Sequence, residues 1–406
     1  MQTSSARSII ASTFMGLAFG VGSALSASAA DMREVYYPGT EQLAAEEMRI
    51  ISCGSGMPMP RLKQAAACLL VELGNGDKLI FDMGTGSVER IYSLAIPLDL
   101  INKVFIGHLH MDHMGDLPAF YQYGPQNNRS VGLKVWGPGG GGTRPEWGMK
   151  AAMKAMQETW AWMSGTLAGT IDTTAFSLEV NEFDWTKVNN IIYEENGVVV
   201  KTIPAIHFEQ SASFILEYAG MTMAFSSDTL PNKWWIENTQ GVDISIHEAF
   251  LPTTLMIEKW KFLAKEALNA GTTIHSSAEF FGKVMALTKP KHAVAYHFQN
   301  DADTLPGVIA AVEKYYDGPV DYAQDFMVWN VTKEGVRTRM AVVNREAFPT
   351  APLHEKKITT SGDRYFTPAE VYSWWPKEEF DPVANEMYDR YNAENGTDFK
   401  FELRSE

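Results

Sequence analysis

The chain has 406 residues, of which 45% are hydrophobic and 20% are charged. This length and apolar content allow one large domain with additions around a sizeable core. The formal net charge is −15, and no run of lysine or arginine could serve as a basic arm for a phosphate backbone. We therefore expect no nucleic-acid partner.

Residues 1–30 predict a secretory leader. They combine Arg7 with an apolar stretch from Ile9 to Leu25 and end in the small residues SASAA. A membrane anchor is the competing interpretation, but the apolar stretch is short and rich in glycine, which favours cleavage after Ala29 or Ala30. We therefore expect a periplasmic or secreted protein that keeps no stable membrane anchor after cleavage.

The chain contains two cysteines, Cys53 and Cys68, which fall in the strand-like segments IISC and ACLLVE. In an oxidising compartment they could form a disulfide between neighbouring strands. They could equally be two buried thiols that pack as small apolar side chains. The sequence leaves both interpretations open.

A dense cluster of candidate metal ligands follows the short apolar stretch KVFI at residues 103–106, which predicts a buried strand ending at Gly107. Extended backbone sends alternate side chains to the same side, so the first two histidines can bind one cation while the turn presents the next two ligands to a second. This mixed nitrogen and oxygen set suits zinc best, with manganese and iron as alternatives. The cluster consists of His108, His110, Asp112 and His113.

Three further candidate ligands lie at the ends of predicted strands. His207 ends VVVKTIPAIH, Asp228 ends MTMAFSSD, and His297 ends HAVAYH. A polar surface loop rich in histidine is the alternative for the first cluster alone. Because four strand ends carry such residues, a metal site is the better interpretation.

The segment 137–197 predicts an insertion that could act as a cap. It begins with GPGGGGTRPEWG, which is flexible by composition, and continues with KAAMKAMQETWAWM, which predicts a helix. An apolar stripe at helical spacing is more often core than binding surface, but here it could also line a pocket for an aromatic substrate. The stripe consists of Met149, Met153, Met156, Trp160 and Met163.

Residues 349–406 predict a C-terminal extension. It is too aromatic for a disordered linker and contains an acidic, helix-compatible stretch near residues 382–395. We expect it to pack against its own domain or against the second subunit of a homodimer. A lid over the active site is the less favoured alternative.

The order of these motifs resembles the metallo-β-lactamase superfamily, and in particular its branch containing tRNase Z and the zinc arylsulfatases. The resemblance covers about residues 48–300, and it implies a four-layer αββα sandwich for a catalytic domain at residues 31–348, with an inserted helical segment and a C-terminal extension. The motifs are IISCGSGMPMP, LIFDMGTGS, HLHMDH, PAIH, FSSDT, IHEAF, IHSSAEFF and AYHF.

The resemblance also implies roles for single residues. His108, His110 and His207 would hold one zinc ion, Asp112, His113 and His297 a second, and Asp228 would bridge the two. Asp112 could also orient the attacking water or accept its proton. Similarity to the branch further implies that His275, oriented by Glu248, protonates the leaving group, whereas in the alternative His247, Glu248 and His275 only satisfy one another by hydrogen bonding. His292 and His354 are placed outside the site.

These roles predict an exported metal-dependent hydrolase in which two cations activate a shared water. By resemblance to the arylsulfatase and phosphodiesterase members, we expect it to cleave a sulfate or phosphate ester of a small organic molecule. Processing of tRNA is disfavoured for an exported, acidic chain. The alternatives are a lactone or amide hydrolase of the same fold and a metal-loaded binding protein without hydrolytic activity.

Overall fold

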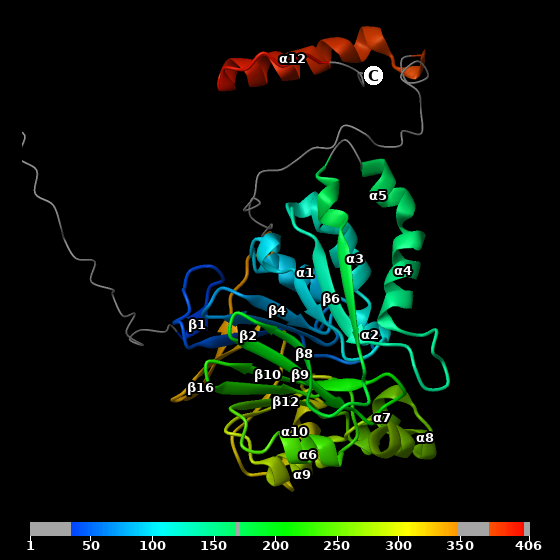
Figure 1. Ribbon diagram of the computed structural model, residues 1–406, viewed down its shortest axis with the longest axis vertical. Coiled ribbons are helices and arrows are strands. Elements are labelled where there is room, and N and C mark those ends of the chain that lie inside the picture. The colour runs from blue at the N-terminus through cyan, green and yellow to red at the C-terminus, as the bar shows by residue number, and fades with distance from the viewer. Residues whose placement is uncertain (1–33, 168–170, 347–372, 402–406) are drawn as a thin grey trace, which may run out of the picture. The chain divides into compact units, whose positions relative to one another are not determined.

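The computed structural model describes residues 34–167, 171–346 and 373–401. The predicted leader and His354 lie outside these residues. Residues 34–346 form two mixed β-sheets packed face to face, with helices on both outer surfaces (Figure 1). This four-layer αββα arrangement confirms the predicted fold class.

In the described residues the first sheet contains nine strands, which run antiparallel from β16 to β4 and parallel from β4 to β7, with β1 parallel to β16. Its strands β15 and β16 come from the end of the domain, and β15 pairs antiparallel with β2. In spatial order the strands are β1 (Val35–Tyr36), β16 (Gly335–Ala341), β15 (Met327–Thr332), β2 (Met48–Gly54), β3 (Cys68–Leu73), β4 (Lys78–Phe81), β5 (Lys103–Phe105), β6 (Leu133–Pro138) and β7 (Leu178–Phe183).

The second sheet contains seven strands, of which four run parallel to one another and carry their carboxyl ends to the same edge. In spatial order the strands are β14 (Val320–Tyr322), β13 (Ala293–Tyr296), β12 (Ile244–Glu248), β11 (Met221–Phe225), β10 (Ala212–Tyr218), β9 (Val198–Pro204) and β8 (Asn190–Glu195).

The core lies in three layers because the strands bury side chains on both faces. In β3, Leu69 and Val71 face the second sheet, whereas Leu70 packs toward the helices. In β10, Phe214 likewise joins the core between the sheets and Ile215 the core on the other face. Burial on both faces explains why these strands appear in the sequence as continuous apolar runs.

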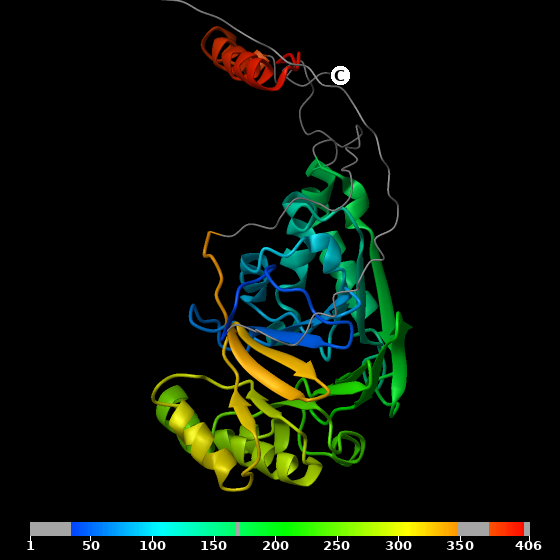
Figure 2. The same cartoon turned by 90° about the vertical axis from the view of Figure 1, so that its left-hand side faces the viewer.

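Two groups of helices cover the outer faces of the sheets (Figures 1 and 2). The first sheet is covered by α1 (Ser87–Ser93), α2 (Met111–Met114), α3 (Leu117–Tyr123), α4 (Met149–Thr159) and α5 (Ala161–Leu167). The second sheet is covered by α6 (Lys233–Asn238), α7 (Thr253–Trp260), α8 (Ala264–Asn269), α9 (Ala278–Thr288) and α10 (Leu305–Glu313).

The segment 137–197 is only partly an insertion. It supplies β7 to the first sheet and β8 to the second. The predicted helix is divided at Trp160 into α4 and α5, and the methionines of α4 at positions 149, 153 and 156 are buried against the first sheet. Trp160 is 46% exposed, so the apolar stripe is core over its first three members and leaves the core at the fourth.

Cys53 and Cys68 lie on the neighbouring strands β2 and β3, and both thiols are buried and free. They belong to the core between the first sheet and its helices. Burial raises the pKa of the Cys68 thiol well above its ordinary value, and the nearby Cys53 adds to this shift. In the structure the two cysteines therefore pack as small apolar residues.

The described part of the C-terminal extension contains the helix α12 (Lys377–Asn395), where the sequence predicts a helix. No residue of α12 is buried. That the extension packs on its own domain or on a second subunit stays a prediction. Among the described residues, no helix has both the length and the apolar character needed to cross a membrane.

Candidate metal centre

All seven candidate ligands lie just beyond the carboxyl ends of strands at one edge of the sandwich. Four follow β5, in the loop that leads into α2 and in α2 itself. One ligand follows each of β9, β11 and β13. Buried phenylalanines at the ends of β4, β5 and β11 pack against one another behind these loops and hold the strand ends in place. The seven ligands are His108, His110, Asp112, His113, His207, Asp228 and His297.

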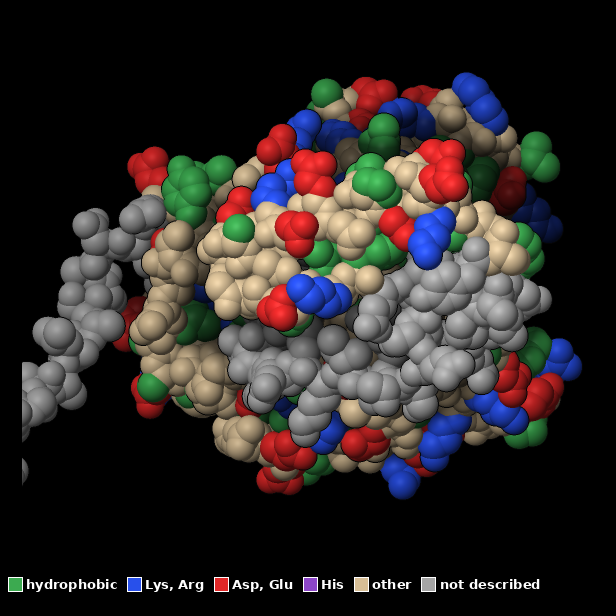
Figure 3. Space-filling model, turned by 90° about the horizontal axis from the view of Figure 1, so that it is seen from above, with side chains coloured by type: hydrophobic (Ala, Val, Ile, Leu, Met, Phe, Trp, Pro, Cys, Tyr) green, Lys and Arg blue, Asp and Glu red, His purple; other side chains and the backbone are tan. Residues whose placement is uncertain are grey.

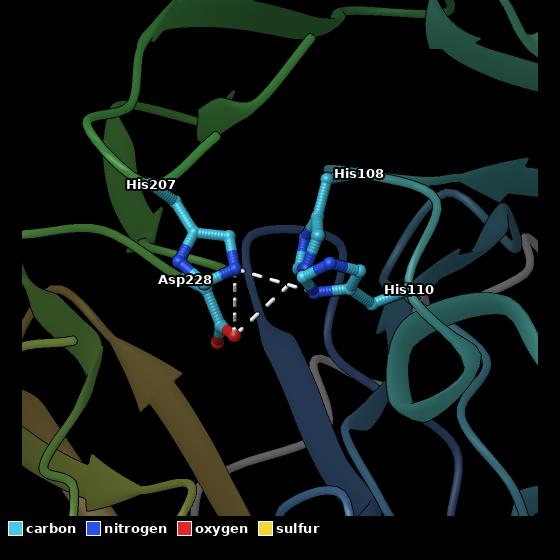
Figure 4. Close-up of side chains that lie close together, drawn as sticks. All are labelled: His108, His110, His207 and Asp228. Carbon is cyan, nitrogen blue, oxygen red and sulfur yellow. Dashed lines mark hydrogen bonds and ion pairs between the residues drawn. The ribbon is translucent and has the colours of Figure 1, made fainter. Parts of the chain in front are cut away.

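The first group of ligands consists of His108, His110, His207 and Asp228, whose ligand atoms lie within 4.8 Å of one another (Figure 4). His110 Nδ1 lies 3.1 Å from His108 Nε2 and 3.3 Å from His207 Nε2. Asp228 Oδ2 lies 3.8 Å from His108 Nε2 and 3.7 Å from His207 Nε2. The structure thus brings together the first set of residues that the resemblance implies.

The second group consists of Asp112, His113, Asp228 and His297. Asp112 Oδ2 lies 3.4 Å from His113 Nε2 and 3.1 Å from His297 Nε2. Asp228 Oδ1 lies 3.2 Å from His113 Nε2 and 3.3 Å from His297 Nε2. Asp228 therefore presents one carboxylate oxygen to each group, as a bridging ligand would.

These distances fit a pair of tetrahedral metal ions. With metal–ligand bonds of about 2.0 to 2.1 Å, neighbouring ligand atoms in a tetrahedral site are about 3.3 Å apart. The measured separations run from 3.1 to 3.8 Å. Neither oxygen of Asp228 accepts a hydrogen bond, although both are buried. Since such atoms are rarely left without partners, the carboxylate is suited to bind cations.

Charge balance also favours cations at this place. Four carboxyl groups are buried in or beside the two groups, and in the described part of the chain all their ion-pair partners are histidines. Buried charges without compensation are costly, and bound divalent cations would compensate the carboxylates that are ionised. The four carboxyl groups belong to Asp82, Asp112, Asp228 and Glu248.

Asp82 is a functional residue that the sequence reasoning missed. It follows β4, and its Oδ2 lies 2.7 Å from His113 Nδ1 and accepts a hydrogen bond from Ser227 Oγ at 2.8 Å. Its Oδ1 accepts a hydrogen bond from the backbone N–H of Gly107 at 2.7 Å. Carboxylates in this position fix the ring and the tautomer of a metal-binding histidine. The sequence signal that could have identified Asp82 is its position directly after a buried strand, the same position that the ligands have.

Other ligand histidines are oriented in the same way. His207 Nδ1 donates to the carbonyl oxygen of Ile274 at 2.9 Å, which leaves Nε2 for the first group. His108 Nδ1 lies 3.3 Å from Ser227 Oγ, the hydroxyl that also contacts Asp82. Ser227 therefore connects the surroundings of the two groups.

Glu248 and His275 form a pair beside the ligands. His275 Nδ1 donates to Glu248 Oε2 at 2.9 Å, and Glu248 Oε1 accepts from the backbone N–H of Thr229 at 2.5 Å. The ring of Phe250 stacks on that of His275, with centroids 4.1 Å apart and planes 5° apart. His275 lies close to Asp228, 3.5 Å from Nδ1 to Oδ2. The imidazole is thus held on two sides at the edge of the centre.

His247 does not take part in this pair. Its Nδ1 donates to the backbone oxygen of Glu248 at 2.8 Å, and its ring packs against Trp235. The alternative in which three side chains satisfy one another therefore fails for His247. His292 forms an ion pair with Asp321 at 2.7 Å and lies outside the centre.

The protonation states of the centre follow from burial and neighbouring charge. Burial raises the pKa of Glu248 well above its usual range, and the Asp228 carboxylate adds to the shift. Burial also lowers the pKa of His275. For Asp228, burial alone would raise the pKa, but His113 and His297 outweigh it and hold the pKa well below its usual range. Asp228 is therefore an anion ready to bind cations.

Comparison with known proteins places the ligand cluster in a recognisable context. Residues 48–135 match the family described as anti-Pycsar protein Apyc1. The chain is 34% identical over 92 residues to ribonuclease Z of Treponema denticola, an alignment that spans 23% of this chain and 29% of that protein. It is 27% identical over 319 residues to ribonuclease Z of Bacteroides thetaiotaomicron, which spans 66% of this chain and 90% of that protein.

Solved structures show the same fold. The metallo-β-lactamase fold protein YhfI of Bacillus subtilis is 15% identical, with a TM-score of 0.53 over 70% of this chain and 99% of that chain. The short form of human tRNase Z is 19% identical, with a TM-score of 0.50 over 69% of this chain and 98% of that chain. These likenesses show that the chain has the metallo-β-lactamase fold.

Two expectations from the sequence are wrong. The aligned relatives are named ribonucleases, which overturns both the expected hydrolase of small organic sulfate or phosphate esters and the expected absence of a nucleic-acid partner. The expected substrate depended on resemblance to the arylsulfatase members, and the expected absence of a nucleic-acid partner depended on the net charge of −15 and the lack of a basic run. Net charge sums the whole surface, whereas a polyanion responds to the local field, and bound divalent cations are the largest local charges in a metal site.

Proposed function

We propose, from the premise that this chain has the metallo-β-lactamase fold and aligns with proteins named ribonuclease Z, that it is a metal-dependent phosphodiesterase that cleaves RNA. The observation that carries the proposal is the pair of ligand groups that share Asp228. Two-metal sites of this kind suit in-line displacement at phosphorus, because both the attacking and the leaving oxygen can be stabilised.

We propose zinc as the metal. Imidazole nitrogen and carboxylate oxygen are donors that zinc accepts in tetrahedral geometry, and the separations of the ligand atoms fit that geometry. Manganese and iron are the alternatives, since neither donor type excludes them. When bound, the pair of cations supplies Lewis-acid activation of water and of the phosphoryl oxygens.

The side chains around the ligands would move protons. The Asp112 carboxylate is placed to orient a water molecule or accept its proton, because it lies among the second group of ligands. In its imidazolium form, His275 would keep its Nδ1–H hydrogen-bonded to Glu248 and would transfer its second proton, on Nε2, to the departing oxygen, which returns the ring to its neutral form. Glu248 thus positions His275, and Phe250 restricts the ring from the side.

The acidic surface does not oppose this function. On the face shown in Figure 3, described acidic and basic side chains are interspersed rather than separated into large areas of one sign. On that face the negative charge is therefore spread, and salt screens such surface charges over about 8 to 10 Å. The cations would dominate the field near the scissile phosphate.

The test uses the zinc-loaded full chain with a 5′-labelled RNA oligonucleotide and with methyl p-nitrophenyl phosphate, a simple phosphodiester. We expect both to be cleaved, and both activities to be lost in Asp228→Ala. Asp243→Asn is the matched control, because Asp243 is a buried carboxylate that pairs with Lys291 away from the centre. Protein that holds two zinc ions and cleaves neither substrate would overturn the proposal. Cleavage of the simple ester without cleavage of RNA would overturn RNA as the substrate.

We further propose that residues 1–30 are a secretory leader and that the mature enzyme acts outside the cytoplasm. The support is the charge, apolar stretch and small residues of this segment. Mass spectrometry of protein from the periplasmic fraction should find a new N-terminus at Ala30 or Asp31. Recovery of the intact Met1 chain in the cytosolic fraction alone would contradict this.

A further inference from the structure

A cavity of about 480 Å³ opens beside the first group of ligands. Its size is within the range of pockets that bind small ligands. His108 and His110 form one wall, so whatever occupies the cavity lies next to the metal centre. We call it the aromatic pocket, after Trp147 and Phe208, which line it together with Thr143, Arg144, Glu209 and Gln210.

Both aromatic rings of the pocket are unusually open to solvent. Phe208 is 54% exposed, and its ring lies edge-on to His110 and His207 at centroid distances of 5.3 and 4.6 Å. Trp147 is 53% exposed, and the guanidinium of Arg144 lies 4.0 Å from its ring centroid. Exposed aromatic rings beside a charged group are typical of surfaces on which nucleobases stack.

The loop that carries Trp147 is fixed, although its glycines predicted flexibility. Glu209 accepts hydrogen bonds from the backbone N–H and the hydroxyl of Thr143, at 3.0 and 2.9 Å. Gln210 donates through Nε2 to the carbonyl oxygens of Arg144 and Gly141, at 3.0 and 3.3 Å. The loop is thereby fastened to the segment that follows the ligand His207. A pocket wall held in this way loses little entropy when a ligand binds.

These hydrogen bonds also limit what the pocket can recognise. Glu209 Oε2 and Gln210 Nε2 are engaged with the loop, so these two atoms are not available to read the edge of a base. The aromatic faces remain as contacts, together with the guanidinium of Arg144, which also forms an exposed ion pair with Glu146 at 3.5 Å. Stacking on aromatic rings tolerates every base, because each base has a π-face.

We propose that the aromatic pocket binds the nucleobase next to the scissile phosphodiester, by stacking and without strong preference among bases. This inference rests on the proposed function and specifies its substrate as a nucleotide ester rather than any phosphodiester. Arg144 contributes positive charge on the same side, where it can contact the phosphate chain.

The kinetic test compares two substrates with the same leaving group, thymidine 5′-(p-nitrophenyl phosphate) and methyl p-nitrophenyl phosphate. The zinc-loaded full chain should prefer the nucleotide ester. In Phe208→Ala and in Trp147→Ala, kcat/KM for the nucleotide ester should fall about 10-fold more than for the methyl ester, mainly through KM, as expected for loss of one stacking ring. Phe208→Tyr should restore the preference, because it keeps a ring.

Trp162→Ala is the matched control, since Trp162 is 65% exposed and does not line the pocket. It should leave both rates unchanged. Equal losses for both substrates in the pocket variants, or no preference in the wild type, would overturn the inference while leaving the proposed function intact.

A binding measurement separates the two proposals if no hydrolysis is seen. Failure of the zinc-loaded wild type to cleave methyl p-nitrophenyl phosphate would count against the proposed function. Isothermal titration with uridine 5′-monophosphate and adenosine 5′-monophosphate should then still show binding, weakened about 10-fold in Phe208→Ala. Absence of binding, or equal binding by wild type and variant, would overturn the proposal that the aromatic pocket binds a nucleobase.

Discussion

Asp228 is the residue on which the centre depends most. Nitrogens of five histidines lie 3.2 to 3.8 Å from its two oxygens, and each oxygen belongs to a different ligand group. We predict that Asp228→Ala loses both metal ions and all hydrolytic activity, because one carboxylate serves both sites. Metal analysis of the purified variant checks this. A variant that still holds two metal ions per chain would contradict the bridging role.

Asp82 should affect metal binding without touching metal. Its Oδ2 lies 2.7 Å from His113 Nδ1, so its removal frees the imidazole to rotate. We predict that Asp82→Ala weakens metal affinity about 10- to 100-fold, as loss of such partners commonly does. Competition with a chromophoric chelator measures the change. Asp243→Asn controls for loss of a buried carboxylate elsewhere. Equal loss of metal affinity in both variants would contradict a specific role of Asp82 in orienting His113.

If His275, oriented by Glu248, protonates the leaving oxygen, the effect of removing it should depend on the leaving group of the substrate. A general acid contributes about 10²- to 10⁴-fold when the departing oxygen needs a proton, and little when it does not. We predict that His275→Ala slows RNA cleavage by such a factor, but slows cleavage of methyl p-nitrophenyl phosphate far less. The ratio of the two rates, at equal metal content, is the measurement. Equal slowing of both substrates would exclude proton donation by His275.

At the scale of elements, Asp321 joins the edges of the two sheets. It lies on β14, and its Oδ2 accepts hydrogen bonds from Trp329 Nε1 on β15 at 2.9 Å and from the hydroxyl of Thr338 on β16. His292 adds an ion pair at 2.7 Å. Burial raises the pKa of Asp321, but the hydrogen bonds from His292, Thr338 and Trp329 outweigh it and lower the pKa below its usual value.

A carboxyl group with a lowered pKa stabilises the fold above its unfolded pKa of about 3.9, and this contribution is lost as pH falls through the folded pKa. We predict that Asp321→Asn lowers the free energy of unfolding by about 1 to 3 kcal/mol at pH 7. The difference from wild type should shrink when the pH falls below about 4. Urea unfolding at both pH values checks this, and a difference that grows on acidification would contradict it.

The sequence predicted the elements of the centre better than their connections. Strand ends at residues 105, 204, 225 and 296 could be predicted from apolar runs followed by ligands, because that pattern is local. The roles of Asp82 and Ser227 could not, since both act through contacts between distant segments. The loop at residues 137–148 was misjudged for the same reason. Its glycines predict flexibility, but hydrogen bonds to Glu209 and Gln210, about 66 to 69 positions later, hold it.

At the scale of the whole molecule, metal binding should stabilise the fold. The centre buries four carboxyl groups whose ion-pair partners, among the described residues, are histidines, so bound cations would add favourable interactions that only the folded state can make. A ligand at a thousand times its Kd stabilises the native state by about 4 kcal/mol. We predict that chelation lowers Tm by roughly 5 to 10 °C. Calorimetry with and without chelator measures this, and an equal shift in Asp228→Ala would assign the effect to the chelator itself.

The ligands are divided between the two sheets, and this has a consequence for biosynthesis. The histidine cluster after β5 is made early, whereas the last ligand, after β13, emerges almost two hundred residues later. Until both sheets have docked, a nascent chain therefore has at most four of the seven ligands in place. The complete set of ligands is present only after assembly, so an unfinished molecule on the ribosome would not carry out the RNA cleavage that we propose.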